Sequence, residues 1–465
     1  MRKSGMGAER VGVPGENGHR RASFVGGRRI LASPRGGSGL PAKRVSRRAT
    51  LAGGGVAALL ALAHLTGDAL NSMLSALLPT LQERFGLSAT TLALLVATIW
   101  FSSALTQPLF GALSDRVGRR VVGSVGVILN TALLSLVGVV PTVWLLFAVL
   151  LVGGFGSAAL HPVGISAARM AGGRNKGLAI GLFSAGGMIG FAVGPVVILY
   201  VVATFGVGAT PWLMVPGVAL GVLMWFLLPD EEHHGGENVE DDPLAHGHRK
   251  IFDAGLVLGP VGLLTLSGVL ASLSLVTFHS AVPLWLVAEG GVAADSPLIG
   301  WTLGAFSLAA GLGGILSGSL SGRVDRRVLV AGTMLAAVAP LLATFFFDIG
   351  TVPFFLAAAL AGGLMYANLP HMILAAQDLA PHAMGAASGM LMGFTSGVAG
   401  LLYVGIGRLQ EIVGLAPAMG LSYLGMVPAA ILALYVLSKY RAALGGRTIG
   451  PHETPVDVRT TAKGA

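Results

Sequence analysis

The apolar run 54–81 carries three polar side chains whose types and spacing could do chemistry. His64, Asp68 and Asn71 are spaced i, i+4 and i+7, so in a helix all three project from one face. Asp68 is the only acidic residue that falls clearly in the middle of an apolar run. Because a charged Asp facing lipid costs about 2.5 kcal/mol or more, we expect this face to line a central cavity. There Asp68 and His64 are predicted to load and release protons; a structural hydrogen bond between neighbouring helices is the alternative.

Two later apolar runs each place a histidine beside a proline. His161 precedes Pro162, and His371 follows Pro370. A proline inside a helix frees a main-chain carbonyl and bends the helix, which suits an element that lines a cavity. The histidines could contact substrate, relay protons or only bond to the freed carbonyls. The residues predicted to bind substrate are Asn71, His161, Asn368 and His371.

The composition indicates what must position these residues. Of the 465 residues, 54% are hydrophobic and only 11% are charged, whereas a soluble domain carries about 25% charged residues. This predicts an all-α protein that crosses a membrane many times, with twelve apolar segments of about 20 residues or more. They are residues 54–81, 89–111, 121–140, 142–168, 178–204, 210–228, 254–287, 298–320, 328–347, 352–377, 383–407 and 416–438.

Hydrophilic stretches divide the chain into five predicted parts. The parts are a disordered basic tail (1–50), a six-helix half (51–228), a central loop (229–252), a second six-helix half (253–440) and a C-terminal tail (441–465). The central loop carries histidines interpreted as incidental, weak metal binders: His233, His234, His246 and His248. No metal site and no cofactor are predicted, and the absence of cysteine excludes thiol catalysis and cysteine-rich metal sites.

The positive charges are confined to one side of the predicted membrane spans. All but two of the 30 Lys and Arg residues lie in the tails, the central loop or the loops at the same end of the runs; the exceptions are Arg84 and Arg408. By the positive-inside rule both termini are cytosolic, and the protein is predicted to lie in the cytoplasmic membrane. The net charge of +9 therefore faces lipid headgroups, and no nucleic-acid partner is predicted.

Residues 111–120, GALSDRVGRR, separate two apolar runs and are predicted to form a tight cytosolic hairpin. Glycines permit the sharp turn, and the aspartate can pair with the neighbouring arginines. The pattern G-x-L-x-D-R-x-G-R-R resembles the loop between helices 2 and 3 of the major facilitator superfamily of secondary transporters. The resemblance implies a conformational latch made of Gly111, Asp115, Arg116, Gly118, Arg119 and Arg120.

The hairpin pattern occurs a second time, which points to a duplicated unit. Residues 318–327, GSLSGRVDRR, match the first hairpin but carry Gly322 in the place of Asp115, so a carboxylate latch is expected only in the first half. Pro79 and Pro283 end the first run of each half, and their separation in the sequence is nearly the same as the separation of the two hairpins. Two pseudo-symmetric six-helix halves, the major facilitator architecture, are therefore expected.

The fifth apolar run contains Gly181-x8-Gly190-x3-Gly194-Pro195. This resembles the antiporter motif of facilitator-type exporters, in which glycines and a Gly-Pro bend pack helix 5 against helix 8. The family pattern continues to a Gly-Gly, whereas apolar residues stand there in this chain. The match favours export and implies antiporter-type packing by these four residues; ordinary small-residue packing is the alternative.

The first, fourth and fifth runs together resemble the fosmidomycin-resistance family. The resemblance is carried by His64-x3-Asp68-x2-Asn71 with the SALLP that follows, and by the GSA, HP and Gly-Pro elements of the later runs. In that family an Asn directly follows the acid-like position of helix 1, whereas two residues separate Asp68 from Asn71 here. The resemblance implies proton-driven efflux of a small antibiotic.

The predicted function is a proton-coupled antiporter that exports a small drug or antibiotic by alternating access, with two halves rocking about a mid-membrane cavity. The alternative is a proton symporter that imports a sugar or organic anion. An intramembrane enzyme using Asp68, His161 and His371, or a receptor or scaffold, is disfavoured because the chain is duplicated and has no recognisable nucleophile or metal constellation. The predicted partners are a small-molecule substrate, protons and the lipid bilayer, and a monomer is expected.

Overall fold

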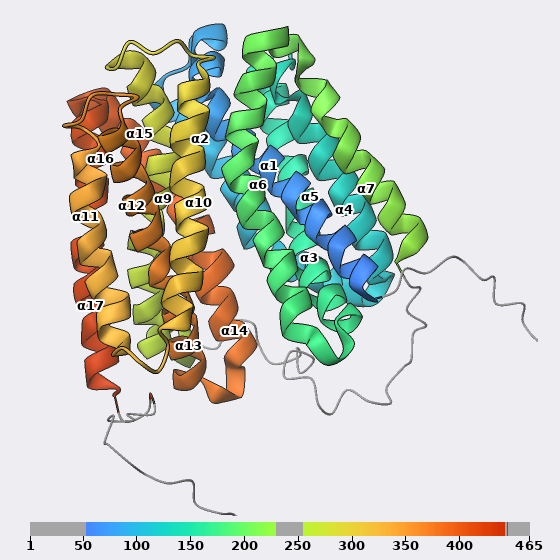
Figure 1. Cartoon of the computed structure of the whole chain (residues 1–465), viewed down its shortest axis with the longest axis vertical. Coiled ribbons are helices and arrows are strands. Elements are labelled where there is room, and N and C mark those ends of the chain that lie inside the picture. Colours follow the sequence, from blue (N-terminus) through green and yellow to red (C-terminus); the bar gives the residue numbers. More distant parts are fainter. Residues whose placement is uncertain (1–52, 229–253, 442–443, 445–465) are drawn as a thin grey trace, which may run out of the picture. The chain divides into compact units, whose positions relative to one another are not determined.

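The computed structural model describes residues 53–228, 254–441 and 444. The predicted N-terminal tail and central loop, and nearly all of the predicted C-terminal tail, lie outside the described residues. All elements of regular structure in the described ranges are helices (Figure 1). This is the architecture expected of a chain that crosses lipid, because a helix satisfies its own main-chain polar groups.

The helices have the following bounds. Before the central loop they are α1 (Gly53–Phe85), α2 (Ala89–Trp100), α3 (Gln107–Val117), α4 (Arg119–Ser135), α5 (Val143–Ala171), α6 (Lys176–Phe205) and α7 (Met214–Leu227). After it they are α8 (Ala254–Leu258), α9 (Pro260–Ala288), α10 (Pro297–Ser319), α11 (Thr333–Ala343), α12 (Val352–Ala367), α13 (Leu369–Leu379), α14 (Met384–Gly389), α15 (Thr395–Val413), α16 (Leu415–Leu424) and α17 (Met426–Lys439). Short 3-10 or π-helical turns join several of them, among them the π-helical turn Phe101–Leu105 between α2 and α3.

Each of the twelve apolar segments predicted from the sequence coincides with helix in the structure. In the described part of the chain, ten helical stretches are long and apolar enough to cross a membrane. An eleventh is the pair 89–105 and 107–117, which is bent by 43° just before the proline at the start of α3. The segment predicted at 328–347 holds a shorter apolar helix, Val328–Ala343.

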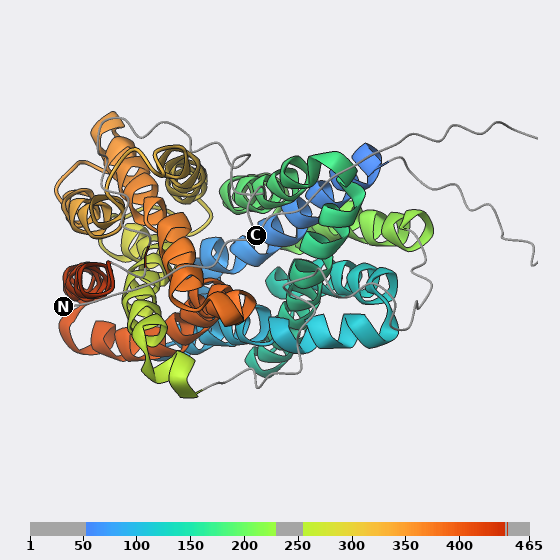
Figure 2. The same cartoon turned by 90° about the horizontal axis from the view of Figure 1, so that it is seen from below.

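Helices α1 and α6 run side by side and are packed unusually closely (Figure 1, Figure 2). A methyl group added at Gly186, Gly190 or Gly194 of α6 would lie less than 3.0 Å from a main-chain carbonyl oxygen of α1. Small residues allow such close approach. The van der Waals contacts that result hold the two helices together in lipid, where helix association has no hydrophobic driving force. The α6 glycines therefore fix the distance between α6 and the polar face of α1.

Two pairs of helices connect the first half to the second. Helix α6 packs against α10, and α2 packs against α15. Gly300 and Gly304 of α10 lie against the main chain of α6 near Pro195 and Ala192. At the start of α2, the main-chain nitrogen of Thr90 donates a hydrogen bond to a carboxylate oxygen of Glu411 at 2.9 Å. The halves thus meet along α6–α10 and α2–α15.

The second hairpin, residues 318–327, contains an ion pair between Asp325 and Arg327. The Asp325 carboxylate accepts hydrogen bonds from the main-chain nitrogen of Arg327 at 2.8 Å and from its guanidinium nitrogens at 3.0 and 2.7 Å. The side-chain bond to Arg327 is the largest cause that lowers the pKa of Asp325 from 3.8 to about 2. Gly322 precedes the pair with φ of 79°, a left-handed conformation that favours glycine.

Replacing this carboxylate tests the hairpin contact. We expect Asp325→Asn to lower the free energy of unfolding at pH 7 by less than about 1 kcal/mol, because the pair is largely exposed. Since the pKa is lowered on folding, the contribution is present above pH 4 and is lost as the pH falls through about 2. Thermal unfolding of wild type and variant should therefore converge on acidification from pH 7 to pH 2. A difference that grows with acidification would contradict this assignment.

Candidate functional site

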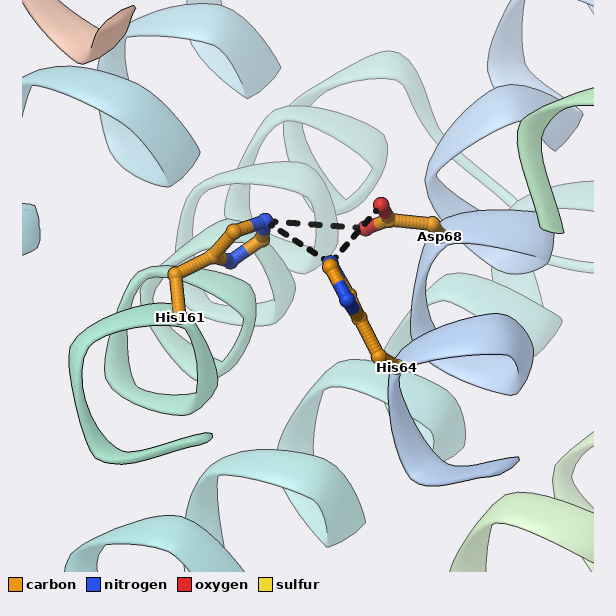
Figure 3. A group of neighbouring side chains, drawn as sticks. All are labelled: His64, Asp68 and His161. Carbon is orange, nitrogen blue, oxygen red and sulfur yellow. Dashed lines mark hydrogen bonds and ion pairs between the residues drawn. The ribbon is translucent and has the colours of Figure 1, made fainter. Parts of the chain in front are cut away.

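The structure brings His64 and Asp68 of α1 together with His161 of α5 (Figure 3). His64 Nε2 lies 3.1 Å from Asp68 Oδ2 and 3.3 Å from His161 Nε2, and His161 Nε2 lies 3.9 Å from Asp68 Oδ1. His64 and Asp68 share a helix face, as their i, i+4 spacing predicts, but His161 is 97 residues away from His64 along the chain. We call these three residues the His–Asp–His cluster.

Main-chain carbonyls fix the orientation of both imidazole rings. His64 Nδ1 lies 2.7 Å from the carbonyl oxygen of Phe183, and His161 Nδ1 lies 2.8 Å from that of Ser157. A carbonyl can only accept, so each contact places a proton on Nδ1. In neutral rings both Nε2 atoms then present lone pairs to each other and to the carboxylate. The cluster is therefore arranged to attract a cation, either a proton or a metal ion.

Asn71 extends the cluster into a hydrogen-bond network. Its amide nitrogen donates to Asp68 Oδ1 at 3.2 Å and to the hydroxyl of Ser157 at 2.8 Å. The amide nitrogen of Asn130 on α4 donates in turn to Asn71 Oδ1 at 3.2 Å and to the carbonyl of Gly153 at 3.1 Å. Our sequence predictions did not include Asn130, although an asparagine inside an apolar run is a detectable signal. A network of this kind orients the Asp68 carboxylate toward the two imidazole rings.

Helix α6 closes over the cluster through Gly187 and Phe183. The Phe183 ring stacks on the His64 ring with centroids 4.1 Å apart and planes 18° apart. A methyl group added at Gly187 would lie 2.5 to 2.7 Å from ring atoms of His64 and from Asp68 Oδ2. Only glycine leaves room for the two polar side chains at this point.

The cluster is buried but not sealed. The side chains of His64 and Asp68 are 8% and 7% exposed, whereas the His161 side chain is 25% exposed. His161 is therefore the member through which an ion or a ligand can reach the other two. Keeping Asp68 charged at this burial requires compensation by its neighbours.

Asn368 and His371, also predicted to bind substrate, lie in a different group of contacts. His371 Nε2 lies 2.9 Å from the Ser317 hydroxyl, and the Asn368 amide donates to the carbonyl of Met365. Asn368 also lines a small cavity of about 60 Å³ between α9, α12 and α15. The four residues predicted to bind substrate are thus divided between the two halves.

Three of the predicted latch residues, Asp115, Arg119 and Arg120, contact residues of their own half of the chain. Asp115 lies 4.0 Å from a guanidinium nitrogen of Arg119, and Arg119 also lies 3.2 Å from the sulfur of Met170 on α5. The guanidinium of Arg120 lies over the ring of Trp225 on α7, 5.7 Å from its centroid. Gly118 has φ of 105° where α3 ends and α4 begins, which explains glycine at this position. Gly111 and Arg116 lie on α3.

The residues of the predicted antiporter motif lie on two faces of α6, which packs against both α1 and α10. Gly190 and Gly194 lie against α1, whereas Pro195 lies against Gly300 of α10. At Gly181 an added methyl group would meet no atom within 4 Å. The reason is helical periodicity: the face that carries Gly190 and Gly194 is directed toward α1, and α10 meets the neighbouring face.

The His–Asp–His cluster can also hold a metal ion. One ligand atom from each of His64, Asp68 and His161 lies within 4.8 Å of the others. The sequence predicted no metal site, because the three residues share no short motif and His161 joins only through the packing of α5 on α1. Two imidazole nitrogens and a carboxylate oxygen are donors that zinc accepts.

A sequence model of the Major Facilitator Superfamily matches residues 60–402 of the chain. The chain belongs to this superfamily. The resemblance seen in the 111–120 hairpin and in the duplication is thereby confirmed, and the protein is a multi-pass membrane protein with the major facilitator fold. The family indicates a secondary transporter of small molecules rather than an enzyme.

Two relatives cover most of this major facilitator chain. The fosmidomycin resistance protein of Escherichia coli (strain K12) is 25% identical over 373 residues, which are 77% of this chain and 86% of the relative. The uncharacterized MFS-type transporter YfnC of Bacillus subtilis (strain 168) is 25% identical over 370 residues, which are 78% of this chain and 88% of the relative.

Solved facilitator structures share the fold. A bacterial homologue of the human lysosomal transporter Spinster, in an inward-facing and occupied conformation, has a TM-score of 0.58 at 16% identity and covers 84% of this chain and 96% of its own. The nucleoside transporter NupG has a TM-score of 0.63 at 16% identity and covers 83% of this chain and 98% of its own. At these identities the likeness establishes the fold alone.

Proposed function

We propose that this facilitator is a proton-coupled antiporter that exports a small drug or antibiotic by alternating access. The observation that carries the proposal is the buried carboxylate of Asp68, with imidazole Nε2 atoms of His64 and His161 at 3.1 and 3.9 Å. Ionisable groups inside membrane spans are costly and typically mark ion or proton pathways. No other carboxylate of the described residues has two histidine partners.

In this proposal, Asp68 and His64 hold the coupling proton. A proton bound among the carboxylate and the two Nε2 atoms offsets the negative charge and lets the cluster remain buried. When the proton leaves, a carboxylate and two lone pairs face one another, and this state is stabilised by water or by substrate that donates hydrogen bonds. Proton and substrate then favour different states of one site, which is what exchange of one for the other requires.

The substrate contacts are proposed to come from both halves of the chain. Asn71 adjoins the cluster and His161 belongs to it, whereas Asn368 lies between α12 and α13 and His371 lies on α13. A substrate that touches residues of both halves can bias the equilibrium between two arrangements of those halves. The hairpin residues Asp115 to Arg120 are proposed to hold the halves together at the cytosolic face in the outward-facing state.

The proposed setting is the cytoplasmic membrane, with both termini in the cytosol and a monomer as the working unit. The distribution of Lys and Arg supports this orientation, since the hairpins 111–120 and 318–327 carry three arginines each. Export is supported by the 25% identity to the fosmidomycin resistance protein.

Direction of transport is the test. The purified protein is placed in proteoliposomes with a pH-sensitive dye inside, and substrates are added in turn, beginning with fosmidomycin-like phosphonates and continuing with lipophilic cations. Substrate-triggered proton movement opposite to the substrate supports antiport. Movement in the same direction would replace the proposal with uptake by symport.

A second prediction concerns His161. We expect His161→Gln to lower proton-driven transport by at least about 10-fold, because the amide cannot take up a proton and positioned acid–base groups contribute about 100-fold or more. His279→Gln is the matched control, since His279 is a buried histidine of α9 bonded to the Leu275 carbonyl and the Ser307 hydroxyl. The measurement is the initial rate of transport by each variant under an imposed pH gradient. Equal rates for the two variants would remove His161 from the proposed pathway.

A further inference from the structure

The donor atoms of the His–Asp–His cluster have the spacing of a transition-metal site. In a tetrahedral zinc site with ligand distances of about 2.0–2.1 Å, neighbouring donor atoms lie about 3.3 Å apart. Here His64 Nε2 lies 3.3 Å from His161 Nε2 and 3.1 Å from Asp68 Oδ2. The distance from His161 Nε2 to the other carboxylate oxygen, Asp68 Oδ1, is wider at 3.9 Å, so a shift of the carboxylate toward His161 is needed for one oxygen to serve with both nitrogens. The three side chains are thus nearly in place for one ion.

The Nδ1 atoms of His64 and His161 make the kind of contact that is typical of metal-ligating histidines. Such a histidine donates its other ring N–H to a carboxylate or a carbonyl, which fixes the tautomer and raises the basicity of the ligand atom. His64 Nδ1 meets the Phe183 carbonyl at 2.7 Å, and His161 Nδ1 meets the Ser157 carbonyl at 2.8 Å. Asp68 is held in turn by the amide of Asn71 at 3.2 Å. Every candidate ligand therefore has a partner that orients it.

The donor types select the class of ion. Two imidazole nitrogens and one carboxylate suit zinc and similar divalent transition metals, whereas magnesium and calcium prefer sites built only from oxygen. Three protein ligands leave a fourth position open, and the 25% exposure of the His161 side chain gives water or an entering ion access to the cluster. A dication also suits this buried site, because it is bound by the Asp68 carboxylate and by imidazole rings that coordinate a metal in their neutral form.

We propose that His64, Asp68 and His161 form a binding site for one divalent transition-metal ion of the zinc class. The ion occupies the atoms that the coupling proton is proposed to use, so a bound metal blocks the transport cycle. Metal binding itself depends only on the donor geometry and holds whether or not the protein is proton-coupled.

The test is zinc binding to the purified, tag-free protein in detergent. The background variant carries glutamine at His233, His234, His246 and His248, so that the central segment contributes no imidazole. Competition with a chromogenic zinc chelator should give one high-affinity ion per chain. We expect His64→Gln and His161→Gln each to weaken binding by more than the roughly 10- to 100-fold that loss of an outer-shell partner costs.

His279→Gln is the matched control and should bind zinc as the background does, because both ring nitrogens of His279 are engaged with Leu275 and Ser307. X-ray absorption at the zinc edge of the background protein reads the ligands without any change in the cluster, and should show two imidazole ligands. Absence of a high-affinity ion in the background protein, equal binding by the cluster variants, or fewer than two imidazole ligands would each overturn the site.

Transport separates this proposal from the proton-coupled function. We expect micromolar or lower zinc to inhibit substrate transport by the background protein in proteoliposomes, with no inhibition of residual transport by His161→Gln. Zinc binding without substrate-driven proton movement would overturn the proposed coupling and leave the metal site standing. Proton movement that zinc at saturating occupancy does not alter would overturn the blocking role assigned to the ion.

Discussion

Asp68→Asn should reduce pH-driven transport to the level of empty liposomes and leave the protein folded. The amide has the shape of the carboxylate, and its oxygen can still accept the hydrogen bond that Asn71 donates at 3.2 Å. Its nitrogen can donate to His64 Nε2, which lies 3.1 Å from the present Oδ2. What is lost is the group that carries a negative charge and takes up a proton.

Substrate counterflow provides the control for Asp68→Asn. In this measurement labelled substrate exchanges for unlabelled substrate across the membrane at equal pH, so no net proton movement is needed. We expect the variant to retain counterflow, which shows that it is folded and binds substrate. Unchanged pH-driven transport would exclude Asp68 as the coupling residue, and loss of counterflow as well would make Asp68 a substrate contact instead.

Gly187→Ala should impair transport nearly as strongly, although it changes no polar group. The added methyl would lie 2.5 to 2.7 Å from atoms of His64 and Asp68, so these side chains must leave their present positions. We expect at least a 10-fold lower rate of pH-driven transport, because positioning of acid–base groups contributes about 100-fold or more. Overpacking should also destabilise the protein by about 1–3 kcal/mol.

Gly181→Ala is the matched control on the same helix. Nothing lies within 4 Å of the methyl group that it adds, and alanine has a higher helix propensity than glycine by about 1 kcal/mol. It should transport as wild type does and unfold at the same or a slightly higher temperature. If Gly187→Ala matched Gly181→Ala in both rate and unfolding temperature, the close packing of α6 over the cluster would be refuted.

The helical architecture was predictable because hydrophobicity alone determines it. Each apolar run must bury its main-chain polar groups within a helix, so all twelve predicted segments contain helix. Exact lengths were less predictable. The segment 328–347 begins with a π-helical turn and holds apolar helix only over Val328–Ala343. Hydropathy marks where a chain is apolar, whereas local turns decide where a helix ends.

Half of the site was predictable for a similar reason. The i, i+4 spacing of His64 and Asp68 is a property of any helix, so their contact followed from the sequence. The contact of His161 with these two residues did not follow from the sequence. It depends on how α5 packs against α1, and His161 lies 97 residues after His64. The contact of Gly190 and Gly194 with α1 could not be predicted either. The sequence shows which residues share a helix face but not which helix packs against that face.

In the proposed mechanism, proton and substrate compete through Asp68. The most direct measurement is proton release by the detergent-solubilised protein in weakly buffered solution when substrate is added, followed with a pH indicator. We expect proton release that saturates with substrate in the wild type and is missing in Asp68→Asn, which still binds the substrate. The same release from both proteins would contradict it.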